Sequence, residues 1–201
     1  MTDLLGLPGG LSSCWFCGKG VSAQALFCHA CGSLQPPGEM DAFARLRLPR
    51  RFDLTSVEIE RQAAGFARIL GADRLEKRGA MERTQADRHR AALTAATDTL
   101  RDPAARARLL LVLAGRELAS ADPPAAWLDR VEQAPVPTVL DKMGVELLAE
   151  MEGAVRALSA AFRVGDLDTA ANRTLHLEGL QQVLERLRRR RRDLTAGSAG
   201  F

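Results

Sequence analysis

The chain has 201 residues, enough for about one to two domains, and its 46% hydrophobic and 26% charged residues are the balance of a globular protein, which excludes a disordered or fibrous one. The net charge of +3 is uneven, because Arg186 and the arginines at 188–192 form a basic end while the remainder is slightly acidic. No apolar stretch approaches the roughly 20 residues that span a membrane. Residues 1–10 also lack the charge and apolar run of a secretory signal. We therefore expect a cytoplasmic protein with reduced cysteines.

Two cysteine pairs come first along the chain. Cys14 and Cys17 form one C-x2-C pair, and Cys28 and Cys31 form a second pair after ten intervening residues. Each pair presents two sulfurs from one tight turn, and two such turns complete the tetrahedral shell that zinc prefers. A glycine follows each pair, where it leaves the sulfur open to backbone N–H donors.

This spacing predicts one structural Zn2+, because four thiolates leave no open coordination position for catalysis. Iron in the same geometry is the alternative metal, and a redox dithiol is a third interpretation. His29 lies inside the second pair. It is either a fifth ligand or, as we expect, a residue of a surface turn.

Helical patterns begin after the linker at 35–38, whose two prolines and glycine interrupt regular structure. A short helix is expected over 41–46. A second helix begins at Thr55, because Thr55 and Glu58 have the spacing of a capping box, and it ends near Gly71. Few aromatic residues, no tyrosine and many leucines and alanines favour helices in the rest of the chain.

Longer helices are expected farther along, at residues 80–100, 102–115, 138–164 and 167–192. The four prolines between 116 and 137 predict a hinge or an irregular connector there. Thr138, with Asp141 three residues later, starts the next long helix in this interpretation. Gly165 and Asp166 then form a short turn, which predicts an antiparallel hairpin of the last two helices.

Several stretches after the cysteines share one known pattern: Asp41-Ala42-Phe43, Phe52-Asp53-Leu54, a run at 95–110 and the helices at 139–143 and 166–180. The run at 95–110 contains a threonine–leucine pair, a proline, an arginine–alanine pair and paired leucines. Together they resemble the HscB-type J-domain co-chaperones of iron–sulfur cluster assembly. Some eukaryotic members of that family also begin with two C-x2-C pairs, so the combination is more diagnostic than either half.

The resemblance implies a mainly α fold, in which a small four-cysteine zinc knuckle module precedes J-domain-like helices and a C-terminal antiparallel helical hairpin. The expected organisation is a zinc-binding module at 1–37, a J-domain-like helical domain at 38–116, a proline-rich connector at 117–137 and the C-terminal helical hairpin at 138–195. Because the apolar seams lie downstream of the module, we expect residues 38–201 to fold without it.

The resemblance also implies two partners, a DnaK-type chaperone and an iron–sulfur scaffold protein. The family acts on the chaperone through a His-Pro-Asp tripeptide after the second J-domain helix. The matching positions here are Gly71, Ala72 and Asp73, so only the aspartate is kept. We therefore expect chaperone binding with little or no stimulation of ATP hydrolysis. Ordinary co-chaperone activity through a divergent loop is the alternative.

The scaffold-binding surface of the family matches the last helices. Val139, Leu140 and Met143 keep its apolar part, and they are either contact residues or ordinary core positions of the hairpin. Gly144 and Gly179 stand where the family often has an acidic residue and an aromatic residue. The expected hairpin is also shorter than the family's three C-terminal helices.

No catalytic set accompanies these features. The histidines at 29, 89 and 176 lie far apart, and no glycine-rich phosphate loop occurs. We therefore expect a binding protein and no enzyme. The alternative function is a zinc-ribbon adaptor, whose arginines at 186–192 bind nucleic acid or an acidic protein partner. Those arginines also suit a solvated helix C-terminus, which is the interpretation we prefer.

Overall fold

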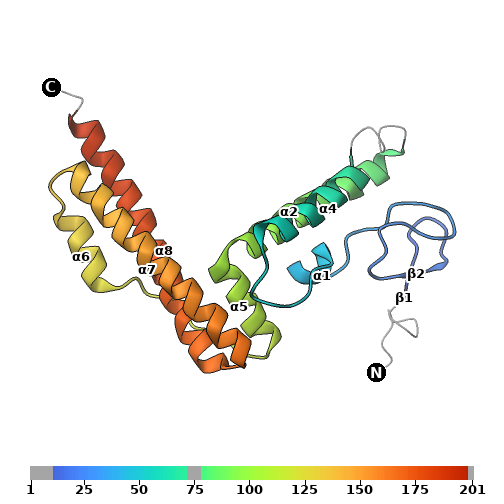
Figure 1. Ribbon diagram of the computed structural model, residues 1–201. Coiled ribbons are helices and arrows are strands. Elements are labelled where there is room, and N and C mark those ends of the chain that lie inside the picture. Colours follow the sequence, from blue (N-terminus) through green and yellow to red (C-terminus); the bar gives the residue numbers. More distant parts are fainter. Residues whose placement is uncertain (1–10, 72–77, 199–201) are drawn as a thin grey trace. The chain divides into compact units, whose positions relative to one another are not determined.

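The computed structural model describes residues 11–71 and 78–198, shown in Figure 1. The described residues of Met1–Pro49 and Leu54–Arg101 form one compact unit, called here the N-terminal unit. Those of Arg50–Asp53 and Asp102–Phe201 form the C-terminal unit. Within the described residues, helices dominate and the one sheet has two strands, so the predicted mainly α fold is confirmed.

The N-terminal unit starts with a small antiparallel sheet. Strand β1 (Leu11–Ser13) pairs with β2 (Gly20–Ser22), with Ser12 opposite Val21. An isolated bridge joins Phe27 to Leu34. These short pairings hold the two cysteine turns beside each other, and Leu34 is fully buried beneath them.

Three helices complete the N-terminal unit: α1 (Ala42–Leu46), α2 (Ser56–Ile69) and α4 (Ala80–Arg101). They pack against one another, and Figure 1 shows α2 and α4 side by side. The predicted capping box starts α2, since the Glu58 amide donates to Thr55 Oγ1 at 3.2 Å and the Thr55 amide donates to the Glu58 carboxylate at 2.8 Å. Helix α2 buries one apolar face, with Ile59 at 1% and Phe66 at 8% exposure.

The C-terminal unit contains α5 (Pro103–Leu113), α6 (Ala125–Gln133), α7 (Pro137–Val164) and α8 (Leu167–Ser198). Helices α7 and α8 form the predicted antiparallel hairpin (Figure 1). Gly165 ends α7 with a left-handed φ of 73°, which L side chains rarely adopt. The carboxylate of Asp166 then accepts a hydrogen bond from the Thr169 amide at 3.0 Å, which is the bond of a helix N-cap.

Two expectations for this unit are wrong. Helix α6 lies in the stretch that the prolines mark as irregular, and its Trp127 and Val131 join the core between α7 and α8. The hairpin therefore has a third helix beside it. Helix α7 begins at Pro137, one residue before the expected start, and the residue before it, Val136, has no side chain that can accept a capping hydrogen bond. Asp141, expected near that cap, instead binds Arg191 of α8 at 2.6 Å.

The core of the C-terminal unit is a pair of apolar clusters along the hairpin. One contains Phe52, which stacks on Phe162 with ring centroids 5.2 Å apart. The second is centred on Leu140, Leu147 and Leu180, all fully buried. Over residues 11–71 and 78–198, no helix carries an apolar stretch suited to a membrane span.

Candidate functional site

The two cysteine turns have the same backbone structure. In the first, the Gly18 amide donates to the Cys14 carbonyl at 2.9 Å, and in the second the Gly32 amide donates to the Cys28 carbonyl at 2.8 Å. Gly18 and Gly32 have φ of 72° and 71°, with no atom within 4 Å of an added Cβ. The left-handed backbone therefore favours glycine at both positions, and steric crowding is not the reason, because a Cβ would have room.

The four sulfurs converge on one point. Cys14 Sγ lies 3.7 Å from Cys31 Sγ, and Cys17 Sγ lies 3.8 Å from Cys28 Sγ. All four Sγ atoms lie within 4.8 Å of one another. A tetrahedral zinc with Zn–S bonds of about 2.3 Å separates its sulfurs by about 3.8 Å, so the geometry fits such an ion. The four cysteines are thus positioned to bind a metal.

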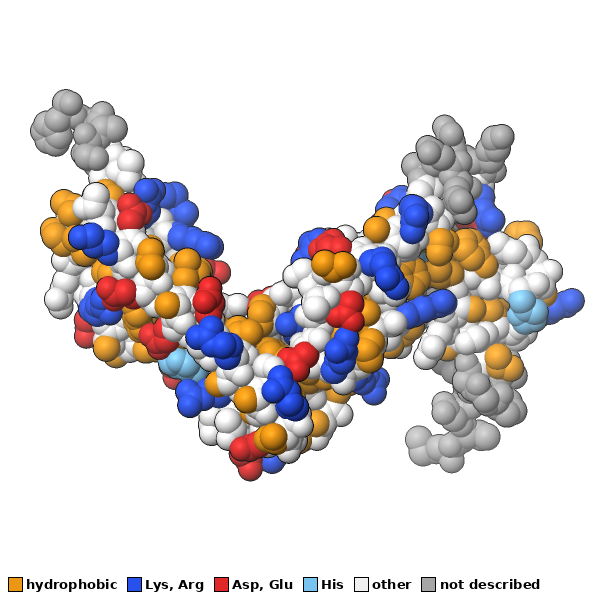
Figure 2. All heavy atoms as spheres, in the orientation of Figure 1, with side chains coloured by type: hydrophobic (Ala, Val, Ile, Leu, Met, Phe, Trp, Pro, Cys, Tyr) orange, Lys and Arg blue, Asp and Glu red, His pale blue; other side chains and the backbone are white. Residues whose placement is uncertain are grey.

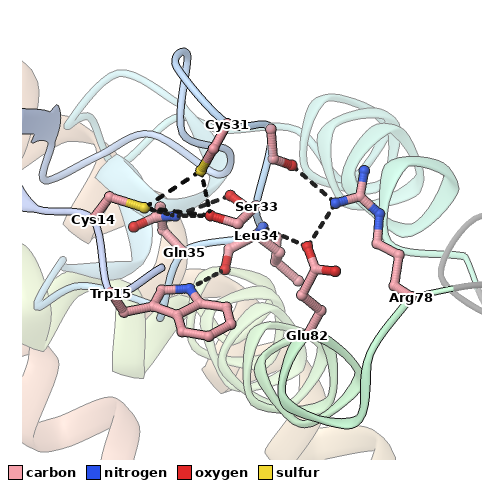
Figure 3. A network of polar contacts seen from close by, with 9 residues as sticks. Cys14, Trp15, Cys31, Ser33, Leu34, Gln35, Arg78 and Glu82 are labelled. Carbon is pink, nitrogen blue, oxygen red and sulfur yellow. Dashed lines mark hydrogen bonds and ion pairs between the residues drawn. The ribbon is translucent and has the colours of Figure 1, made fainter. Parts of the chain in front are cut away.

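Backbone and side-chain donors surround the sulfurs. The Phe16 amide lies 3.4 Å from Cys14 Sγ, and the Ala30 amide lies 3.4 Å from Cys28 Sγ. The Ser33 hydroxyl lies 3.1 Å from Cys31 Sγ. Figure 3 shows this contact as a dashed line. Donors of this kind spread the negative charge of thiolates and orient them toward a metal.

These contacts alter the acidity of the thiols. Burial alone would raise the pKa of Cys14, but the hydroxyl of Ser33 and nearby backbone amides outweigh it and lower the pKa to about 5. The Lys19 amide lowers the pKa of Cys17, yet burial and the neighbouring thiols raise it to about 11. The opposite shifts of these two pKa values indicate that thiols this close do not all ionise without a neighbouring positive charge. A bound cation would favour four thiolates.

His29 is exposed and lies outside this group of four ligand atoms. It is a surface residue of the turn, as we expected.

Three residues near the metal centre were missed from the sequence. Ser33 occupies the same place after its cysteine pair that Lys19 occupies after the first, so aligning the two turns would have identified it. Gln35 is buried, and its Nε2 lies 3.4 Å from Cys14 Sγ. Glu82 accepts a hydrogen bond from the Leu34 amide at 3.0 Å, a contact across 48 residues that no local pattern signals.

The positions that match the chaperone loop follow α2 directly. Gly71 comes after Leu70, whose carbonyl accepts a hydrogen bond from Arg90 of α4 at 2.7 Å. Ala72 and Asp73 lie outside the described residues. The expectation for this loop therefore stays a prediction.

The three residues matched to the scaffold surface lie at the start of α7. Leu140 and Met143 are buried at 0% and 4% exposure, whereas Val139 is 37% exposed. Gly179 of α8 lies under the stretch before α6, where an added Cβ would be 2.6 Å from the Asp122 carbonyl oxygen. An aromatic side chain at this position would meet that backbone, which explains the glycine.

The arginines at the end of α8 are partly neutralised within the chain. Arg186 pairs with Glu132 at 3.1 Å, and Arg191 pairs with Asp141 at 2.6 Å. Arg188, Arg189 and Arg192 are exposed. Figure 2 shows basic side chains gathered over this part of the hairpin.

Comparison with known proteins gives a clear answer on the fold. No protein-family model matches the sequence, and no curated protein matches it. Among solved structures, the chain is similar to the human co-chaperone protein HscB, with a TM-score of 0.77, 20% identity and coverage of 90% of this chain and 99% of the human one. It is also similar to the chaperone HscB from Vibrio cholerae, with a TM-score of 0.64, 20% identity and coverage of 77% and 99%. The fold is therefore that of the HscB co-chaperones, as the sequence resemblance predicts.

Proposed function

We propose that this protein is an HscB-like co-chaperone or scaffold component of iron–sulfur cluster assembly, which binds a DnaK-type chaperone, a cluster scaffold protein or both. The single observation that carries the proposal is the match to human HscB over 90% of the chain. The role is one of binding and not of catalysis. Four free cysteines suit a reducing compartment, and we place the protein in the cytoplasm.

The resident metal in this proposal is Zn2+, held by Cys14, Cys17, Cys28 and Cys31. The sulfur separations suit zinc, and four thiolates complete its shell without an open position. The ion would thus fold the module and supply no chemistry. Iron in the same shell is distinguished by its visible absorption and by elemental analysis.

Chaperone contact would use the α2–α4 side of the N-terminal unit. At the positions of the family's His-Pro-Asp, Gly71 and Ala72 supply neither an imidazole nor a rigid backbone. Arg68 on the exposed side of α2 still offers positive charge to an acidic surface. We therefore expect binding with little or no stimulation of ATP hydrolysis.

Scaffold contact would use the start of α7. Val139 is the exposed member of the proposed set, while Leu140 and Met143 hold the helix in place from within the core. Val145 and Leu148 add exposed apolar area farther along the same helix, at 70% and 48% exposure. Exposed apolar side chains on a helix are suited to a protein partner.

The deciding experiment titrates the purified protein into a DnaK-type chaperone and, separately, into a cluster scaffold protein from the same cell. Saturable binding to either one, with less than about twofold stimulation of the chaperone's ATPase, is the expected result. The double variant Gly71→His, Ala72→Pro should raise the stimulation, because it restores the tripeptide beside Asp73. Absence of binding to both proteins would refute the proposal, and strong stimulation by the unchanged protein would restore the ordinary co-chaperone activity.

The exposed arginines of α8 favour one alternative, an adaptor that binds nucleic acid or an acidic protein partner. Binding to nucleic acid would weaken steeply with salt, since each neutralised phosphate releases a counterion. The paired carboxylates of Glu132 and Asp141 oppose such binding. Salt-dependent capture of RNA or DNA, lost in Arg188→Glu, Arg192→Glu, would support this alternative.

A further inference from the structure

A short segment after the last cysteine is bound to the start of α4. The Leu34 amide donates to Glu82 Oε1 at 3.0 Å, and Arg78 Nη1 donates to the Gly32 carbonyl at 2.9 Å. Arg78 Nη1 also donates to Glu82 Oε1 at 2.7 Å, so the two side chains act together. Figure 3 shows this network between the cysteine turn and the helix.

The network depends on the conformation of residues 32–34, which the cysteine turn sets. Gly32 has its left-handed φ, and the Cys28 amide donates to the Ser33 carbonyl at 2.9 Å. The Ser33 hydroxyl also contacts the sulfurs of Cys14 and Cys31, at 3.4 and 3.1 Å. A metal on these sulfurs would therefore fix the Gly32 carbonyl and the Leu34 amide where Arg78 and Glu82 meet them.

Arg78 and Glu82 lie at the start of α4. They bracket the first residues of α4, directly after the segment that joins α2 to α4. Arg78 also lies over the Phe27 ring at 5.4 Å, which adds a second contact between the module and this point. Glu82 is half-buried in the contact, and its pKa is lowered: burial opposes ionisation, but the Leu34 amide and Arg78 outweigh it.

We propose that Glu82 and Arg78 are positioning residues through which a metal on the four cysteines holds the first turns of α4 in place. Loss of the metal would release residues 32–34 and break the bonds of both side chains to that segment, leaving the ion pair between Arg78 and Glu82. The start of α4 would then open locally, while its far end stays closed through the core of α1, α2 and α4. If the proposed function also holds, the metal would thereby act on the chaperone-facing side of the unit.

Amide hydrogen exchange of the full chain tests this without any chaperone, so its outcome is independent of the proposed function. The zinc-loaded protein is compared with protein stripped by a chelator under reducing conditions, with metal content checked by elemental analysis. Exchange at residues 83–86 should become at least about tenfold faster in the stripped protein, because hydrogen bonds to charged groups are lost there. Exchange at residues 97–101 should change by less than about twofold.

Substitutions distinguish the contacts of Glu82 and Arg78 with residues 32–34 from general effects on the helix. In Glu82→Ala, exchange at 83–86 should be fast with or without metal. The ratio of the exchange rate in the stripped protein to that in the zinc-loaded protein should therefore fall to about one. Glu82→Gln keeps an oxygen for the Leu34 amide and should retain part of the ratio. Asp87→Ala is the matched control, since Asp87 pairs with Arg90 on the same helix and the ratio should match that of the unchanged protein.

Three results would overturn the proposal. They are an unchanged rate at 83–86 after metal removal, a uniform rise along the whole of α4, and a Glu82→Ala protein that responds to metal as the unchanged protein does. The second would show that the metal supports the entire unit, and the third that its effect bypasses Glu82.

Discussion

The two units hold their helices together by different means. In the N-terminal unit, α1 has only 5 residues and α2 has 14, lengths at which isolated helices are marginal. Their unit is completed by the two cysteine turns, and residues 32–35 after the second turn form hydrogen bonds with Arg78, Glu82 and His89 at and within α4. In the C-terminal unit, α7 and α8 have 28 and 32 residues and bury continuous apolar seams. The N-terminal unit thus adds a four-cysteine centre and polar contacts to the apolar core of its short helices, whereas the C-terminal unit relies mainly on apolar packing along two long helices.

Each unit contains one of the two tryptophans, which makes the comparison measurable. Trp15 is next to Cys14, and its Nε1 donates to the Leu34 carbonyl at 2.8 Å. Trp127 is buried in the C-terminal unit. The variant Trp127→Phe therefore reports the N-terminal unit by fluorescence, and Trp15→Phe reports the other.

The largest effect should follow Cys31→Ser, because binding of structural zinc is worth about 10–16 kcal/mol in small zinc modules. We expect metal content to fall from about one to less than about half an equivalent, with loss of the Trp15 signal of folding. The Trp127 transition should stay unchanged. Ser22→Ala, on the exposed side of β2, should keep the metal. A Trp127 transition that collapses together with the metal would show that the units are not separate.

The second effect belongs to the apolar unit. Leu158 is fully buried between α7 and α8, and Leu158→Ala should cost about 2–5 kcal/mol through lost burial and a cavity. Urea unfolding followed by Trp127 measures it. Leu148→Ala, at 48% exposure on the same helix, should change stability by less than about 0.5 kcal/mol. Metal content should not change in either variant, and a loss of metal in Leu158→Ala would contradict the division.

A third and smaller effect compares two glycines of the hairpin. A Cβ at Gly179 would lie 2.6 Å from the Asp122 carbonyl oxygen, so Gly179→Ala should cost about 1–3 kcal/mol. Gly144 has open space around it within α7, and Gly144→Ala should stabilise the unit by up to about 1 kcal/mol. Opposite signs in the Trp127 transition are the expected result. Equal signs would show that the stretch before α6 does not press on α8.

Local patterns in the sequence predicted the features that local interactions form. The cysteine spacing indicated the four residues that the structure positions to bind a metal. Thr55 and Gly165 marked helix ends correctly because caps depend on neighbouring residues. Helix α6 was missed because its nine residues lie between prolines, and its stability comes from packing against α7 and α8. The contacts of Glu82 and His89 join residues 48 and 54 positions apart, which no short motif records. Truncation to residues 38–201 would remove these partners of Glu82 and His89. Folding of that fragment and the boundary at 37 both stay predictions.

The smallest effect concerns pH and the third contact of the module, that of His89. This histidine is buried on α4, and its Nε2 donates to the Gln35 carbonyl at 2.8 Å. Burial lowers its pKa below the ordinary value, the bond to Gln35 opposes this, and the charge of Arg45 lowers it further. The unfolded chain therefore takes up a proton first as the pH falls below about 6.5.

Stability from His89 is thus complete above about pH 6.5 and is lost as the pH falls toward the lower folded pKa, with a slope of at most about 1.4 kcal/mol per pH unit. His89→Gln keeps a donor for Gln35 but cannot titrate, so the Trp15 transition should depend less on pH between about 7.5 and 5.5. Metal ligands and carboxylates titrate in both proteins, and their contribution cancels in the difference. His176→Gln in the C-terminal unit is the control and should leave the Trp15 slope as it is. The same pH dependence of the Trp15 transition in the His89→Gln and unchanged proteins would contradict this prediction. The His89 contact would then not make the N-terminal unit more sensitive to acid than the C-terminal unit.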